Sequence, residues 1–212
     1  MQSRKLYGNL LETMKIFGLT GGICSGKSRT SKLFSALRVG IIDADQLARD
    51  VVTPGSKGLE SVISRFGAEY LLEDGTLNRP KLGDRVFKNQ KDLSDLNEIL
   101  HPLIEEAYQH HAEIMEQGDY SYCLYDCPLL FELGLHTRYK ASVLVAASRE
   151  LQTERLLKRG HTIDQAEARL GAQMDLESRT ALATHIILND NDSQALEIRV
   201  INTHRQLLDL CS

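Results

Sequence analysis

The sequence predicts an α/β fold built on a parallel five-stranded sheet. Three observations predict it: short β-rich runs, helical patterns between them, and a length of 212 residues, which suits one α/β domain with inserted lobes. The β-rich runs are residues 15–20, 39–43, 120–126, 141–147 and 185–189. Several are almost continuously apolar, as strands buried on both faces are. Because strands that alternate with helices form parallel crossovers, we expect a doubly wound sheet.

Helical patterns fill the intervals, and two intervals are too long for ordinary crossovers. The helical patterns are residues 28–37, 92–117, 149–158, 163–176 and 194–210. We expect a core of residues 14–45, 120–150 and 183–212, a mostly helical insertion at about 46–118, and a cationic helical lid at about 151–180. Residues 1–13 form an extension before the first strand, and Met14 is an alternative start.

Composition limits the classes of function. The chain is 42% hydrophobic with a net charge of −4, so we expect no general binding to nucleic acid. The four cysteines show no C-x₂-C spacing of a zinc or redox site, and nothing in their number demands disulfides. We find no signal peptide and no segment apolar enough to span a bilayer. These features predict a cytoplasmic protein that does not bind a membrane and has no evident obligate protein partner.

Residues 21–28 read GGICSGKS and match G-x-x-x-x-G-K-[ST] in full. The match follows a predicted strand and opens a predicted helix, the context that a P-loop requires. Gly21, Gly22 and Gly26 let the backbone amides wrap around a polyphosphate, and the helix adds its positive N-terminal end. Lys27 supplies a charge for the β- and γ-phosphates, and Ser28 offers a hydroxyl to Mg²⁺. The sequence therefore predicts binding of ATP with Mg²⁺.

Two acids follow the second predicted strand at the edge where ligands of open α/β sheets bind. Asp43 and Asp45 are two residues apart, so in an extended segment their side chains point the same way. One of them is a candidate base that accepts a proton from an attacking hydroxyl. The alternative is structural, with Asp45 as the N-cap of the helical run that follows it. The pattern alone leaves both interpretations open.

Asp126 ends the third predicted strand, where a carboxylate orders Mg²⁺ through water in many P-loop proteins. The strand is mixed and aromatic, so capping of the following loop remains the alternative. Arg155 and Arg159 are four apart and share one helix face. They fit either a lid that neutralises transferred charge or a solvated basic face.

Two classes of P-loop protein compete. A GTPase switch needs N-K-x-D and D-x-x-G motifs, and neither is present where it is required. An inserted helical lobe and a cationic lid favour a small-molecule kinase that closes over its acceptor and excludes water. A kinase that acts on another nucleoside or nucleotide, and an ATP-binding regulatory module, are the alternatives.

Beyond the P-loop, several ordered motifs resemble the dephospho-coenzyme A kinase family from Met14 almost to the C-terminus. The motifs are GLTGGICSGKS (18–28), IDADQLARDVVTPGSKGL (42–59), DGTLNRPKLGDRVF (74–87), LHPLI (100–104), DCPLLFE (126–132), Gln152 with Arg155 and Arg159, and Asn189 at the last strand. The resemblance implies a fold like that of nucleoside-monophosphate kinases, with a core, an acceptor-binding helical domain and a lid. It implies that ATP phosphorylates the ribose 3′-hydroxyl of dephospho-CoA, giving coenzyme A and ADP.

The resemblance also implies roles for individual residues. The catalytic residues would be Asp45 as the base, with Lys27, Arg155 and Arg159. The residues at ATP would be Gly21, Gly22, Ile23, Cys24, Ser25, Gly26, Lys27, Ser28, Arg29 and Asn189. The residues at the acceptor would be Asp45, Arg49, Arg79, Arg85, His101, Pro102, Leu129, Leu130 and Glu132. Ser28 and, through water, Asp126 would serve Mg²⁺. The chain departs from the family at Cys24, usually glycine, and at Arg29, usually threonine.

Overall fold

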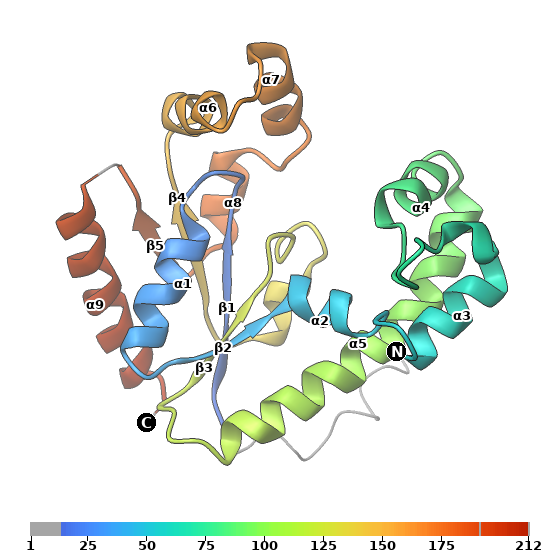
Figure 1. Ribbon diagram of the computed structural model, residues 1–212. Coiled ribbons are helices and arrows are strands. Elements are labelled where there is room, and N and C mark those ends of the chain that lie inside the picture. Colours follow the sequence, from blue (N-terminus) through green and yellow to red (C-terminus); the bar gives the residue numbers. More distant parts are fainter. Residues whose placement is uncertain (1–13, 191, 212) are drawn as a thin grey trace. The chain divides into compact units, whose positions relative to one another are not determined.

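The computed structural model describes residues 14–190 and 192–211 (Figure 1). Its sheet has five strands in the order β2-β3-β1-β4-β5. The strands are β1 (Ile16–Gly21), β2 (Gly40–Asp43), β3 (Cys123–Asp126), β4 (Ser142–Ala146) and β5 (His185–Leu188). The strand pairs β1–β3, β1–β4 and β4–β5 are parallel. The α/β class and the parallel five-stranded sheet predicted from sequence are confirmed.

The register of the central strands brings the ends of β1, β3 and β4 to one edge. Leu19 of β1 pairs with Asp126, the last residue of β3, and Gly21 pairs with Val145 of β4. The carboxyl edge of a parallel sheet is where ligands of α/β proteins bind. The segment that follows β1 is therefore positioned by two neighbouring strands.

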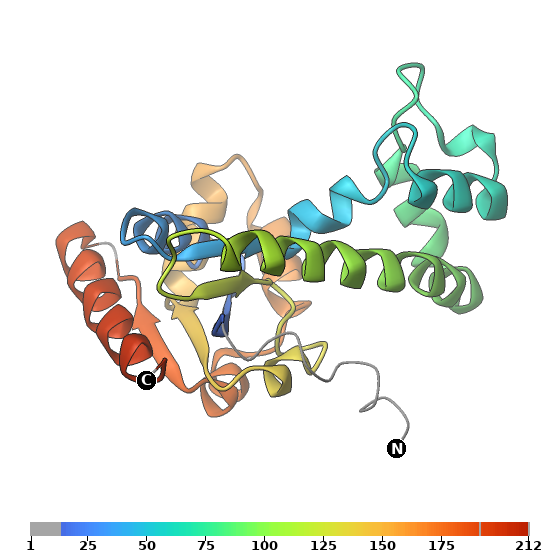
Figure 2. The same cartoon turned by 90° about the horizontal axis from the view of Figure 1, so that it is seen from below.

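Two helices cover one face of the sheet. They are α1 (Lys27–Ala36) and α9 (Ser193–Asp209), and α9 lies beside β5 in both views (Figures 1 and 2). Phe34 of α1 and Leu196 of α9 join the core that Phe17, Leu124 and Val143 form on the strands. All five side chains are almost fully buried, and burial of apolar area on this scale is the main stabilising term of the fold.

The lid region is divided differently from the sequence prediction. Helix α6 spans Arg149–Lys158, as predicted, but the helix expected over 163–176 ends early. It is α7 (Ile163–Gly171), and a separate helix, α8 (Leu176–Leu182), follows. The carboxylate of Asp175 caps α8 by accepting from the Ser178 amide at 2.7 Å. An aspartate N-cap stops one helix pattern from running into the next.

The chain separates into two compact units. One holds residues 1–42 and 115–212, of which the structure describes those named above, and the other spans residues 43–114. The second unit is helical, with α2 (Ala44–Asp50), α3 (Lys57–Phe66), α4 (Arg79–Val86) and most of α5 (Gln90–Glu116). Its own core includes Val62, Phe66, Leu82 and Val86. Searched over the described residues, the helices include none that is long and apolar enough to cross a membrane.

Candidate active site

The P-loop lies between the end of β1 and the start of α1. Gly26 is the residue before α1 and has a φ of 97°, a conformation that favours glycine. A Cβ at this position would also lie 1.9 Å from the side-chain nitrogen of Asn189. Glycine is therefore required here both by the turn and by the close approach of Asn189.

Side chains from the lid and from the end of β5 bind the backbone of the loop. Gln152 donates to the Ile23 carbonyl at 2.6 Å, and the Gln173 side chain accepts from the Ile23 amide at 2.9 Å. Asn189 donates to the Ser25 carbonyl at 2.7 Å. Arg155 donates to the carbonyls of Cys24 and Asn189 at 2.9 and 3.0 Å. Three successive loop carbonyls are thus satisfied by protein, which holds the loop in a fixed shape.

Several residues predicted to bind ATP line one cationic pocket beside the loop. The pocket has a volume of about 360 Å³. It is lined by Cys24, Gly26, Arg29, Arg155, Lys158, Arg159 and Asn189. Four of these seven residues are basic, so the pocket suits a polyanion. The structure thus brings the predicted lid arginines and the predicted nucleotide residues together.

Lys27 forms an ion pair with the carboxylate of Asp126. Both side chains are largely shielded from solvent, at 16% and 5% exposure. The residue predicted for phosphate and the residue predicted for Mg²⁺ are therefore direct neighbours. The pair keeps the lysine at the loop and neutralises its charge within the protein.

Cys24 adopts a left-handed conformation with a φ of 56°. Its side chain packs with Leu156 of α6 and with Ala166 and Leu170 of α7. Figure 1 shows α6 and α7 together beyond the end of β4. The bulk of Cys24 is therefore used in an apolar contact between the P-loop and the lid helices.

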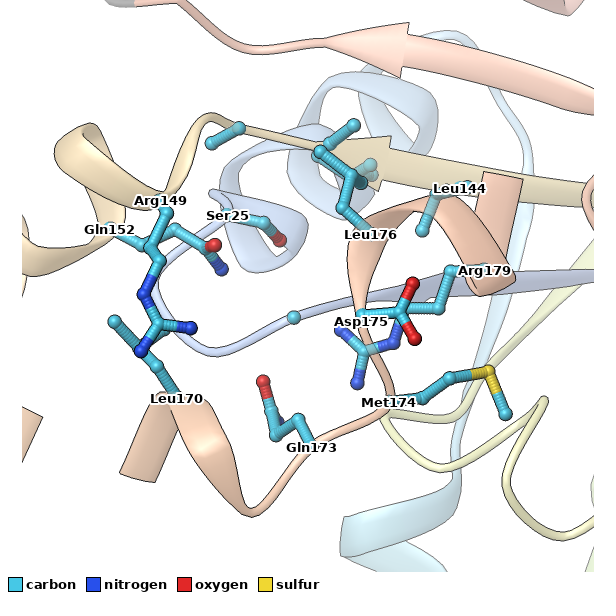
Figure 3. Close-up of a pocket in the computed structure, with 14 residues that line it drawn as sticks. Ser25, Leu144, Arg149, Gln152, Leu170, Gln173, Met174, Asp175, Leu176 and Arg179 are labelled. Carbon is cyan, nitrogen blue, oxygen red and sulfur yellow. The ribbon is translucent and has the colours of Figure 1, made fainter. Parts of the chain in front are cut away.

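Sequence reasoning missed three polar residues at the loop. Gln152 entered only as part of a motif, and neither Arg179 nor Gln173 was predicted as a site residue. Figure 3 shows them around a pocket with Ser25 and Arg149. The N-cap signal of Asp175 marks the start of α8, and it was the available clue that Arg179 belongs to a separate helix.

In the 43–114 unit, Asp43, the last residue of β2, and Asp45 have different local roles. Asp43 is the N-cap of α2 and accepts from the Gln46 amide at 3.0 Å. The interpretation of Asp45 as the cap was wrong, because Asp45 lies inside the first turn of α2. The segment is also not extended, so the two side chains do not share a direction by strand alternation. Asp45 is exposed, and its role as the base stays a prediction.

Arg49 and Arg79 lie close enough for their charges to interact. Arg79 donates to the Ala48 carbonyl at 3.0 Å. Burial and the charge of Arg49 lower the pKa of Arg79 from its ordinary value. Two neighbouring guanidinium groups repel each other and favour an anion between them. This arrangement suits the predicted role of both residues at an anionic acceptor.

Arg85 is engaged differently. It donates to Asp92 at 2.7 Å and lies over the rings of Phe66 and Tyr70. Arg65 binds the same buried carboxylate at 2.9 Å. Hydrogen bonding to Arg85, before the other causes, lowers the pKa of Asp92. Arg85 therefore has a structural role here, and its predicted contact with the acceptor stays untested.

The remaining acceptor candidates lie on two segments. His101 and Pro102 are exposed on α5. After β3, Leu129 is 47% exposed, whereas Leu130 is fully buried against Gly18 of β1. Glu132 forms an ion pair with Arg179 at 2.5 Å. Of the two leucines, Leu129 alone offers an accessible surface.

The dephospho-CoA kinase family matches residues 15–195, which is most of the chain. The chain belongs to the dephospho-CoA kinase family. Curated relatives of the chain carry the name dephospho-CoA kinase. The relative from Bdellovibrio bacteriovorus is 39% identical over 183 residues, covering 86% of this chain and 91% of that protein. The relative from Streptomyces avermitilis is 44% identical over 184 residues, covering 86% and 89%.

Solved structures agree with the fold. The crystal structure of TT1252 from Thermus thermophilus matches with a TM-score of 0.80 and 27% identity, over 93% of this chain and 99% of that one. A shikimate kinase from Bacteroides thetaiotaomicron matches with a TM-score of 0.51 and 16% identity, over 92% and 98%, which shows the shared fold alone. The fold is thus that of small P-loop kinases.

Proposed function

We propose that this chain transfers the γ-phosphoryl group of ATP to the ribose 3′-hydroxyl of dephospho-CoA, giving coenzyme A and ADP. The observation that carries the proposal is the family match over residues 15–195, which includes an intact P-loop between β1 and α1. Transfer of a phosphoryl group demands positioning and charge stabilisation more than covalent chemistry. The described residues supply both.

The nucleotide's phosphates bind at the P-loop. Lys27, which is paired with Asp126 in the structure, binds the β- and γ-phosphates of ATP. The helix dipole of α1 adds a partial positive charge at the same place. Because Gln152, Asn189 and Arg155 hold the loop carbonyls, these oxygens are kept occupied and do not repel the phosphates.

Mg²⁺ accompanies ATP in this proposal, and the donors present fit it. Ser28 offers a hydroxyl and Asp126 a carboxylate, and Mg²⁺ prefers such oxygen ligands. Within residues 14–190 and 192–211, no group of three His, Cys, Asp or Glu side chains forms a metal site. When bound, Mg²⁺ neutralises charge that develops on the phosphates.

Asp45 accepts the proton of the acceptor hydroxyl, and Arg49 and Arg79 bind the anionic part of dephospho-CoA. Arg159, which lines the cationic pocket, stabilises the transferred charge. Arg155 combines this role with its bonds to the loop carbonyls. The cytoplasmic location expected from the sequence belongs to the same proposal and stays a prediction.

Acceptor specificity tests the function directly. ADP release from ATP would be measured with dephospho-CoA, AMP, uridine or no acceptor. Of these four conditions, we expect rapid turnover only in the one that contains dephospho-CoA. Equal turnover with AMP or uridine would indicate another nucleotide kinase, and binding of ATP without turnover on any acceptor would indicate a regulatory module.

The assignment of Asp45 is tested by Asp45→Asn. Loss of a general base lowers kcat by about 10²–10⁴-fold, because the hydroxyl proton then has no acceptor in place. The matched control is Asp50→Asn, on the same helix, where the carboxylate accepts from the Gln46 side chain at 2.7 Å. If Asp45→Asn kept the wild-type kcat with dephospho-CoA, the base would have to be another residue.

A further inference from the structure

Arg179 on α8 is the only buried basic side chain of the described residues. It is 4% exposed, although arginine is almost never buried unless its charge is compensated. Its neighbours are the P-loop and the segment after β3, both of which belong to the core unit. Packing alone does not explain why a guanidinium group is buried beside the P-loop.

The compensation of this guanidinium is incomplete. Its Nη2 donates to Glu132 at 2.5 Å, which matches one charge. Its Nε is buried and, within the described part of the chain, has no hydrogen-bond partner. A buried donor left without an acceptor costs about 1–3 kcal/mol. The side chain is therefore arranged to donate to a further group.

The guanidinium lies against the first turn of the P-loop. A Cβ on Gly22 would lie 2.6 Å from Arg179 Nη1 and 2.8 Å from Gln152 Nε2. Gly22 is thus needed because side chains approach it, and Arg179 is one of them. The absence of a side chain at position 22 lets a cation reach the loop that binds the phosphates.

A cavity of about 230 Å³ adjoins this place (Figure 3). Arg179, Gly22 and Ser25 are among its lining residues. The hydroxyl of Ser25 is also buried without a partner among the described residues. Two buried polar groups at one cavity beside a polyphosphate loop point to an oxyanion as the ligand.

We propose that Arg179 is a further catalytic residue that contacts the transferred γ-phosphoryl group, with Glu132 holding its guanidinium in place. This assignment rests on the proposed kinase function. In the reaction, the bond from Pγ to the β–γ bridging oxygen breaks and that oxygen stays on ADP. The acceptor oxygen bonds to Pγ, and its proton passes to Asp45. Arg179 donates through Nη1, the nitrogen that lies against Gly22 of the loop, to an oxygen of the moving group.

A comparison of two nucleotides tests the contact without any acceptor. Calorimetry in the presence of Mg²⁺ would measure the affinity of the protein for ADP and for the imido analogue of ATP. These two nucleotides differ by the γ-phosphate. For Arg179→Met we expect the analogue to bind about 10²-fold more weakly, while ADP binding changes less than about threefold. The control is Arg169→Met, an exposed arginine on α7, which should change neither affinity.

Arg179→Lys is a second variant, in case Arg179→Met does not fold. It keeps a positive charge at this position but lacks the planar guanidinium group. It should weaken analogue binding about tenfold and leave ADP binding unchanged. Equal weakening of both nucleotides would overturn the proposal, because it would assign Arg179 to loop structure alone. Unchanged binding of both would also overturn it. The two proposals can fail separately. If Arg179→Met selectively weakened binding of the ATP analogue but the wild type did not phosphorylate dephospho-CoA, the proposed function would fail while the Arg179 contact stood.

Discussion

In the unit that holds the P-loop, arginine side chains donate to loop carbonyls and to a carboxylate beside the loop, whereas in the 43–114 unit two of them converge on Asp92. Arg155 and Arg179 represent the first arrangement. Arg65 and Arg85 represent the second, and both also lie over the Phe66 ring. The same residue type is thus placed in two kinds of environment.

The two arrangements distinguish arginines that stabilise the fold from arginines that bind a ligand. Around Asp92, two guanidinium groups surround one carboxylate, so that charge is used within the protein. Arg49 and Arg79 of the same unit are unlike them, since no ion pair of the described residues includes either. Arg179 pairs with Glu132 but keeps a buried Nε that has no partner among the described residues. We infer that the donors left over after an arginine has paired within the protein, more than its exposure, indicate its role.

The largest effect should come from the P-loop lysine. Lys27→Met removes the charge that binds the β- and γ-phosphates, and we expect kcat/KM for ATP to fall by about 10²–10³-fold. Lys32→Met, an exposed lysine on the same helix, is the matched control and should stay close to wild type. A small effect of Lys27→Met would mean that its pair with Asp126 is mainly structural.

The contrast within the helical unit is sharpened by comparing two arginines. Arg79→Met should raise KM for dephospho-CoA about tenfold, because a charge-assisted bond to the acceptor is lost, and should leave KM for ATP and the melting temperature nearly unchanged. Arg65→Met should do the reverse, lowering the melting temperature with little change in either KM. Steady-state kinetics and thermal denaturation measure both. The comparison breaks if the two variants behave alike.

The network around Asp92 also predicts a pH dependence. The pKa of Asp92 is lowered in the folded chain, so the unfolded chain binds a proton more readily. The contribution of Asp92 to stability is therefore complete above about pH 4, the ordinary aspartate range, and is lost as pH falls through the folded pKa.

Asp92→Asn should consequently lower the melting temperature at pH 7, and the gap to the wild type should narrow at pH 3. Thermal denaturation at both pH values checks this. Asp84→Asn, on α4, controls for the general effect of removing an acid from this unit. A gap that stayed constant with pH would show that the charge of Asp92 does not stabilise the fold.

The sequence predicted the sheet and the P-loop because both depend on local patterns. Continuous apolar runs define β1 and β4, and the glycines with Lys27 define the loop. Their physical causes are burial and backbone freedom, which a single segment displays. The family followed from the order of motifs along the chain.

What the sequence could not predict depends on contacts between distant segments. Gln173 lies 150 residues from Ile23, and Arg179 lies 47 from Glu132, so no local pattern marks either bond. The predicted helix over 163–176 failed because an apolar period continued across the true end at Gly171. The cap of α2 was placed on Asp45 because the turn into the helix begins two residues earlier, at Asp43, than the pattern indicated.

The smallest effect concerns Cys24, where the P-loop meets the lid helices. Its left-handed conformation costs an L-residue about 1–2 kcal/mol, and its buried contacts with Leu156, Ala166 and Leu170 offset part of that cost. Cys24→Gly relieves the strain and loses the contacts, so we expect stability to stay within about 1 kcal/mol of wild type.

Cys24→Ala keeps the strain and loses the sulfur, so it should be less stable than Cys24→Gly. Leu156→Ala, at a fully buried position of the same cluster, should cost about 2–5 kcal/mol and sets the scale of a true core contact. Denaturant titration of the three variants gives the order. If Cys24→Gly lowered the free energy of unfolding as much as Leu156→Ala, the Cys24 side chain would be a main contact of the lid helices. The packing of these helices would then require the P-loop, just as the loop carbonyls require Gln152 and Arg155 of the lid.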